Sequence, residues 1–205
     1  MKFKILHCEL FISFSFFAAA AVMMAGGRSE VYFRILYFAF FHELGHTLIL
    51  MFYGYKIKCV TLTAFGARIE CESFDDADCY VKALVWLSGA FVNLLFAAAF
   101  YISGGYTDEV CNNLLLALFN LMPYYNFDGW NALVCIAEKY AVKSETAEAF
   151  KHISSLVAVT LFTAADIVLI FKNTPDIMLI LMNLYLIFGI LIQLKPKSQK
   201  ISATS

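Results

Sequence analysis

Two histidines lie four positions apart in the chain, and a glutamate directly follows the first of them: His42, Glu43 and His46. Residues i and i+4 share one face of an α-helix, so two imidazoles at this spacing can bind the same metal ion. Glu43 lies one position round the helix, where its carboxylate can accept a proton from a water molecule that the metal activates. This chemistry is typical of zinc-dependent hydrolysis, although so short a pattern also arises by chance in soluble helices.

The residues around the motif are strongly apolar. Between residues 31 and 53 the formal charges are Arg34 and Glu43, and the segment is long enough to cross a bilayer. Ionisable side chains in hydrocarbon are costly unless something pairs with them, so they are functional candidates by default. Two of the four histidines of the chain have the required spacing, and a zinc ion would be their partner. The sequence therefore predicts a metal site inside a membrane.

Composition also indicates a membrane protein. Of the 205 residues, 61% are hydrophobic and 15% are charged, and the mean hydropathy is +0.74, whereas soluble domains are roughly half apolar and a quarter charged. The net charge of −1 offers no basic surface, so we expect no nucleic-acid partner. A chain of this length holds about six spans with short loops. We predict a single intramembrane peptidase domain over residues 1–197 and a polar tail over 198–205.

We predict an all-α polytopic membrane protein with about six transmembrane helices and a small membrane-associated β-hairpin after the second helix. The fourth hydrophobic run contains Pro123 and Asp128–Gly129, so we expect it to unwind where protein satisfies the freed backbone groups. The first run has features of a signal peptide, but its apolar core exceeds the usual length of about 7 to 15 residues, so we interpret it as a retained anchor. The six predicted spans cover residues 5–25, 31–53, 80–103, 110–137, 153–171 and 177–194.

The distribution of basic residues predicts the orientation of these spans. Of the 15 lysines and arginines, Arg28, Arg34 and Lys172 fall on one side of the six-span topology, and the others fall on the side of both termini. Basic residues accumulate in cytoplasmic loops. We therefore expect both termini in the cytoplasm and the metal motif in the middle or the cytoplasmic half of the bilayer.

The segment after the second span predicts a β-hairpin over residues 57–70. Polar and apolar residues alternate there, β-branched residues are frequent, and Phe65–Gly66 is typical of a turn. One interpretation is a connector that merely links two helices. The other is an exposed edge strand, to which an extended substrate peptide adds through backbone hydrogen bonds. The residues predicted for this pairing are Val60, Thr61, Leu62 and Thr63.

A hydrolytic zinc site needs a third protein ligand and an open position for water. Asp128 is the better of two carboxylates, because the broken fourth span places it at membrane depth. Asp–Gly pairs also form ordinary turns, so a turn aspartate is the alternative interpretation of Asp128. Asp166 in the fifth span is the rival ligand, unless it pairs with a neighbouring polar side chain.

Four segments of the chain carry a family resemblance: residues 42–46, the hairpin at 61–67, and the stretches 88–93 and 120–129. In order and spacing they resemble the site-2 protease family of intramembrane zinc metalloproteases. More narrowly, they resemble its compact six-span branch, which contains bacterial sporulation proteases that process a sigma-factor precursor. The sequence departs from the family pattern at Ala90, Asn126 and Trp130, and none of these is an expected ligand.

The resemblance implies a function, a cofactor and partners. It implies a zinc metalloendopeptidase that cuts a membrane-associated protein substrate in regulated intramembrane proteolysis. His42, His46 and Asp128 would hold one Zn²⁺ per chain, and Glu43 would be the catalytic base. The implied location is a bacterial cell membrane, where the partners are the lipid bilayer, the substrate and an inhibitory or regulatory membrane protein.

Two asparagines in the apolar spans, Asn93 and Asn120, need partners because an unsatisfied buried amide is costly. The resemblance implies that Asn93 binds the substrate backbone or the developing oxyanion, and we consider the same role for Asn120. Hydrogen bonding between helices is the alternative for both residues.

Two other classes of membrane protein bind metals. A di-iron desaturase or hydroxylase needs several histidine clusters, and a chain with four histidines and one such pair cannot supply them. A catalytically inactive or transport-type zinc-binding protein is the remaining alternative. Glu43 favours the enzyme, because hydrolysis requires a base and ion passage does not.

Overall fold

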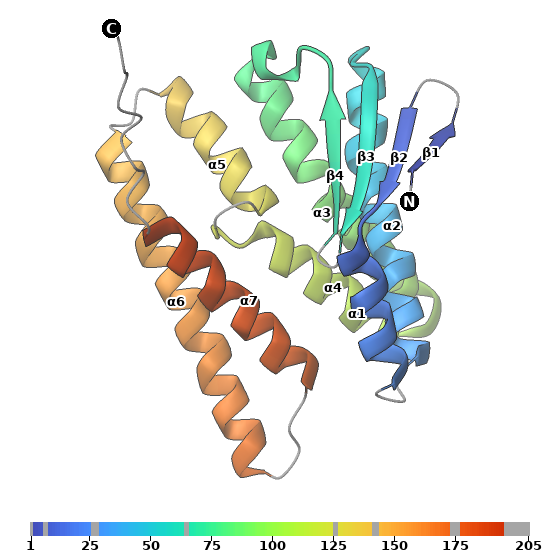
Figure 1. Cartoon of the computed structure of the whole chain (residues 1–205), viewed down its shortest axis with the longest axis vertical. Helices are drawn as coiled ribbons and strands as arrows, with labels where there is room; N and C mark the ends of the chain where they lie inside the picture. Colours follow the sequence, from blue (N-terminus) through green and yellow to red (C-terminus); the bar gives the residue numbers. More distant parts are fainter. Residues whose placement is uncertain are drawn as a thin grey trace, which may run out of the picture. The chain divides into compact units, whose positions relative to one another are not determined.

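The computed structural model describes residues 2–5, 8–25, 29–63, 66–124, 127–140, 144–172 and 177–194 (Figure 1). The chain divides into two compact units. The first consists of Met1–Met122 with Phe127–Val142, and the second consists of Pro123–Asn126 with Lys143–Ser205. The chain thus leaves the first unit briefly between its fourth and fifth helices.

The first unit contains a small sheet and five of the α-helices. Its strands are β1 (Lys2–Ile5), β2 (Cys8–Ile12), β3 (Ile57–Thr63) and β4 (Gly66–Cys71). Its helices are α1 (Phe14–Ala25), α2 (Ser29–Phe52), α3 (Cys79–Gly104), α4 (Asp108–Leu121) and α5 (Asp128–Lys139), with a 3-10 turn η1 at Phe74–Asp76. The second unit contains α6 (Ser144–Phe171) and α7 (Ile177–Leu194).

Three described helices are long and apolar enough to cross a membrane: α2 over Phe33–Phe52, α3 over Cys79–Gly104, and α6 over His152–Phe171. The six predicted spans are therefore not confirmed, although the mostly helical fold is. Large apolar side chains point outward from α2, an arrangement that is expected where lipid is the solvent. Those side chains are Phe33, Tyr37, Phe40, Leu48 and Met51.

The predicted first span, residues 5–25, is wrong as a continuous helix. Strands β1 and β2 occupy its beginning, and α1 has 12 residues. At 1.5 Å per residue such a helix is about 18 Å long, which is shorter than the roughly 30 Å of a bilayer core. The physical reason is long-range: β2 pairs in parallel with β3, and this pairing satisfies the backbone groups that a helix would otherwise satisfy internally.

The sheet has the order β1-β2-β3-β4. The hairpin predicted over residues 57–70 is confirmed by the antiparallel pair β3 and β4, in which Val60 lies opposite Ile69. The predicted turn is Phe65–Gly66, and Phe65 lies outside the described residues. However, β3 is an inner strand. Its two sides pair with β2 and with β4, so the predicted exposed edge at Val60, Thr61, Leu62 and Thr63 is wrong.

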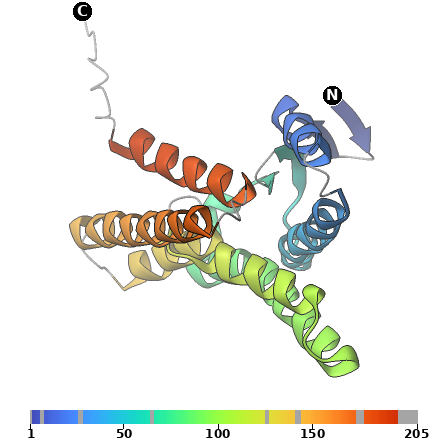
Figure 2. The ribbon, with the colours of Figure 1, turned by 90° about the horizontal axis from the view of Figure 1, so that it is seen from below.

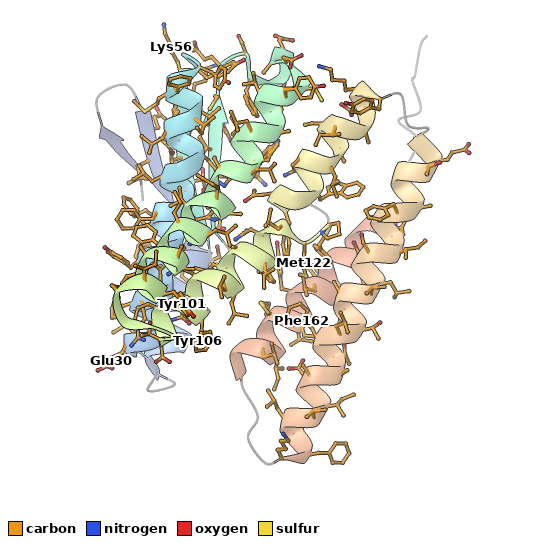
Figure 3. All side chains as sticks on the ribbon, turned by 180° about the vertical axis from the view of Figure 1, so that it is seen from behind. Glu30, Lys56, Tyr101, Tyr106, Met122 and Phe162 are labelled. Atoms are coloured by element: carbon orange, nitrogen blue, oxygen red, sulfur yellow. The ribbon has the colours of Figure 1, made fainter. Side chains whose placement is uncertain are left out.

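Helix α3 is the centre of the first unit, because it packs against α2, α4 and α5. Figure 3 shows Glu30 at one end of α2 and Lys56 just past the other end. Tyr101, in the last turns of α3, and Tyr106, between α3 and α4, lie near the Glu30 end. At that end Arg34 Nη1 lies 3.3 Å from Asp108 Oδ2 and 3.3 Å from Glu109 Oε1. These ion pairs join the first turn of α4 to α2.

The fourth hydrophobic run is broken, as predicted: α4 ends at Leu121 and α5 begins at Asp128. Gly129 permits the sharp return, because a Cβ at this position would overlap the carbonyl group of Leu121. At its other end α5 is held to α3 by Lys139, whose Nζ lies 3.4 Å from the centroid of the Tyr80 ring. Together these contacts fix the position of Asp128, the first residue of α5.

In the second unit, α6 and α7 pack side by side (Figure 2). The Tyr124 hydroxyl donates a hydrogen bond of 2.5 Å to the Leu186 carbonyl of α7. Asn183 Nδ2 donates to Asp166 Oδ2 at 2.8 Å and to Thr163 Oγ1 at 3.1 Å. Asp166 thus has the neighbouring polar partner that was the alternative to metal binding.

Candidate metal centre

Three buried side chains from α2 and α5 converge in the first unit. His42 and His46 are 4% and 6% exposed, and Asp128 is 9% exposed. His42 Nε2 lies 2.9 Å and His46 Nε2 lies 3.2 Å from Asp128 Oδ2, and the two Nε2 atoms are 3.2 Å apart. The structure therefore brings together the three predicted ligands.

The dimensions of this triangle suit zinc. A tetrahedral Zn²⁺ with bonds of about 2.0 to 2.1 Å separates its ligand atoms by about 3.3 to 3.4 Å. The sides of the triangle, 2.9 to 3.2 Å, are close to these separations. Two imidazoles and one carboxylate are also a donor set that catalytic zinc sites use with a fourth, open position.

Hydrogen bonds on the far side of each imidazole assign its tautomer. His46 Nδ1 lies 2.7 Å from the carbonyl oxygen of Val85, and a carbonyl can only accept, so Nδ1 carries the proton. His42 Nδ1 lies 2.7 Å from Asn93 Oδ1, which is also an acceptor. Both rings consequently present the lone pair of Nε2 to the centre, as a metal ligand requires.

Asn93 does not have the predicted geometry of an oxyanion donor. Its side chain is fully buried. Its Oδ1 accepts from His42, and its Nδ2 donates to Asn113 Oδ1 at 3.0 Å. The alternative, hydrogen bonding between helices, is what the structure shows. Asn120 Nδ2 donates to the Leu116 carbonyl of its own helix at 2.9 Å, and a role for Asn120 in substrate binding stays a prediction.

Glu43 lies between the metal centre and the sheet. Its Oε1 accepts a hydrogen bond of 3.1 Å from the backbone N–H of Ala67 in β4. The glutamate predicted from the sequence as the base is thus held by the edge of the sheet, and it lies on the same helix as the two histidines.

No family model matches the chain. A zinc metalloprotease of Methanocaldococcus jannaschii is 26% identical over 198 residues, which cover 88% of this chain and 56% of that protein. Stage IV sporulation protein FB of Bacillus subtilis is 25% identical over 128 residues, which cover 58% of this chain and 44% of that protein. The chain therefore spans about half the length of these curated relatives.

A solved structure has the same fold. The site-2 protease from Methanocaldococcus jannaschii aligns with a TM-score of 0.61 and 20% identity over 92% of both chains. The chain is thus similar in sequence to zinc metalloproteases and shares the fold of a site-2 protease. The resemblance drawn from four short segments is thereby confirmed over the length of the chain.

Two glycines shape the candidate metal centre. At Gly45 of α2 a Cβ would lie 2.9 Å from the Ser88 carbonyl, so the small residue lets α2 and α3 approach closely. At Gly89 of α3 a Cβ would lie 2.5 Å from His46 Nε2 and 2.6 Å from His42 Nε2. Gly89 therefore leaves open the volume into which both ligand nitrogens point.

Replacing Gly89 with alanine is expected to abolish zinc binding, because the added methyl group would occupy the space of the ion. The zinc content of protein purified in detergent, measured by elemental analysis, should fall to near none. The matched control is Gly104→Ala in the same helix, where a Cβ would meet Thr107 Cγ2 at an ordinary 3.7 Å. Full zinc content in Gly89→Ala would show that the ion binds elsewhere.

Sequence reasoning missed two residues of the centre, Gly89 and Asn113. Asn113 carried a usable signal, because a buried amide in the predicted fourth span needs a partner as much as Asn93 does. Gly89 carried none, since the need for a small residue there depends on how closely α3 approaches α2.

Proposed function

We propose that the protein is an intramembrane zinc metalloendopeptidase, which hydrolyses a peptide bond in or near a membrane-associated segment of a protein substrate. The observation that carries the proposal is the buried triangle of His42, His46 and Asp128 beside Glu43. The two histidines of this triangle belong to α2, a helix long and apolar enough to cross a membrane. A zinc ion bound there would polarise the scissile carbonyl and make a water molecule more acidic.

Other residues of the chain have the remaining roles in this proposal. Glu43 accepts the proton of the attacking water and delivers it to the leaving amine. Val85 and Asn93 keep the imidazole rings in the tautomer that exposes Nε2. Burial of the three ligand side chains limits the number of water molecules that reach the site, which strengthens the electrostatic interactions within it.

We further propose that an extended substrate pairs with β4 and not with β3. In the part of the chain that is described, β4 is an edge strand of the sheet. The N–H of Ala67 is directed to Glu43 and so away from β3. Because N–H directions alternate along an antiparallel strand, the N–H of Ile69 faces the same free edge. A peptide added there would run past the base and the metal ligands.

A proline at position 69 tests this pairing. Ile69→Pro removes one N–H from the free edge, and prolines are tolerated on edge strands, so zinc binding should persist. The loss of one backbone hydrogen bond of about 0.5 to 1.5 kcal/mol corresponds to a fall in kcat/KM of roughly 2- to 13-fold. Ile69→Ala is the control, because it shortens the side chain and keeps the N–H. Equal rates for Ile69→Pro and Ile69→Ala would show that substrate does not use this edge.

The substrate class can be tested in cells. We propose that the protein is a multi-pass protein of a bacterial cell membrane and acts in regulated intramembrane proteolysis. We also propose that both termini lie in the cytoplasm, an orientation supported by the distribution of basic residues. In cells that carry Glu43→Gln in place of the wild-type protein, comparative proteomics of the membrane fraction should show one or a few uncut membrane proteins that accumulate. A membrane proteome identical to that of the wild type would argue for the non-catalytic zinc-binding alternative.

A further inference from the structure

Asn113 lies on α4 and is linked to the metal ligand His42 through one intervening side chain, that of Asn93. Its side chain is fully buried, and it takes part in a chain of hydrogen bonds across three helices. Asn113 Nδ2 donates to the Glu109 carbonyl at 2.8 Å, Asn93 Nδ2 donates to Asn113 Oδ1 at 3.0 Å, and Asn93 Oδ1 lies 2.7 Å from His42 Nδ1.

The direction of this chain is set at its α4 end. A backbone carbonyl can only accept, so the Glu109 carbonyl must face the NH₂ group of Asn113. The Oδ1 of Asn113 must then face Asn93, which turns the NH₂ group of Asn93 toward Asn113. The Phe38 carbonyl, 3.5 Å from Asn93 Nδ2, favours the same orientation. The remaining atom, Asn93 Oδ1, faces His42, so the proton of that ring is placed on Nδ1.

We infer that Asn113 is a positioning residue, which acts through Asn93 to fix the tautomer and ring orientation of the metal ligand His42. Without the Asn113 acceptor, the Asn93 amide can turn over and present its NH₂ group to His42 Nδ1. That arrangement favours the ring with its proton on Nε2, which cannot bind a metal. The inference rests on the proposed zinc site, and it adds a residue of α4 to a centre built from α2, α3 and α5.

The test measures zinc affinity and not peptide cleavage. Detergent-purified full-length protein is titrated with a zinc chelator of known affinity at constant pH, and the thermal midpoint of each metal-free variant is recorded. In Asn113→Leu, the leucine side chain has nearly the size of asparagine and lacks the amide group. It should raise the zinc dissociation constant about 10- to 100-fold, as the loss of an outer partner of a metal ligand does. Asn113→Asp keeps an acceptor toward Asn93 and should restore the affinity toward the wild-type value.

A double-mutant cycle separates positioning from general destabilisation. Asn113→Leu should have no further effect on zinc affinity in an Asn93→Ala background, because its route to His42 is already lost. The matched control is Asn112→Leu, which removes the neighbouring amide of α4 and should bind zinc like the wild type. If Asn113→Leu does not fold, Asn113→Ala takes its place in the cycle.

Two results would overturn the inference: unchanged zinc affinity in Asn113→Leu, or equal losses from this change with and without Asn93. A wild-type protein that binds no zinc would instead overturn the proposed function itself. The two failures are therefore distinguishable in the same titration.

Discussion

Glu43→Gln is expected to lower kcat for peptide cleavage by about 10²- to 10⁴-fold, the usual contribution of a general base. Glutamine has the shape of glutamate and still offers an acceptor to the Ala67 N–H, but it cannot take up the proton of the attacking water. Zinc content should stay at about one per chain. Cleavage of a purified membrane-protein substrate and elemental analysis of the same sample provide the two measurements.

The control for Glu43→Gln is Glu70→Gln, which changes an exposed carboxylate on β4 in the same chemical way. Its cleavage rate should match that of the wild type. If Glu43→Gln cleaves at the wild-type rate, another group is the base. If it loses the zinc as well as the activity, Glu43 belongs to the ligand set and its assignment has to change.

Asp128→Asn is expected to reduce zinc affinity by more than about 100-fold, because it removes a charged ligand and the loss of an outer-shell partner alone costs 10- to 100-fold. His46→Ala should have a comparable effect. Chelator titration followed by elemental analysis measures both. Neither variant is expected to cleave substrate at a measurable rate under conditions in which the wild type does.

Asp166→Asn is the matched control for Asp128→Asn. Both residues are buried carboxylates in hydrophobic segments, and the change is the same. Asp166 bonds to Asn183, so its replacement should leave zinc content and kcat unchanged. Retention of zinc in Asp128→Asn together with its loss in Asp166→Asn would reverse the choice between the two carboxylates.

The buried polar side chains of the first unit form one connected group in the described part of the chain. Ser88 lies 3.4 Å from His46 Nδ1, and Asn113 reaches His42 through Asn93. Asp128 contacts both histidines. Polar groups are costly in hydrocarbon, and here they are satisfied around a single centre. The rare polar residues of these apolar segments therefore mark the position of the site.

The sequence alone was sufficient for features that depend on local pattern. The spacing of His42 and His46 places both residues on one face of a helix. The break before Asp128 follows from Pro123 and Asp128–Gly129 in the interrupted span. The hairpin over residues 57–70 follows from alternation and β-branched residues. These features depend mainly on the types and the spacing of neighbouring residues.

Tertiary structure decided the features that depend on residues distant in sequence. Pairing of β2 with β3 converted the start of the predicted first span into strands and moved the open edge of the sheet from β3 to β4. Because α3 lies close to α2, Gly89 borders the space into which the two ligand nitrogens point. The orientation of Asn93 depends on Asn113, which lies on a different helix. Hydropathy and periodicity do not predict which strands or helices pack next to one another. The packing depends on how the whole chain buries its backbone and polar groups.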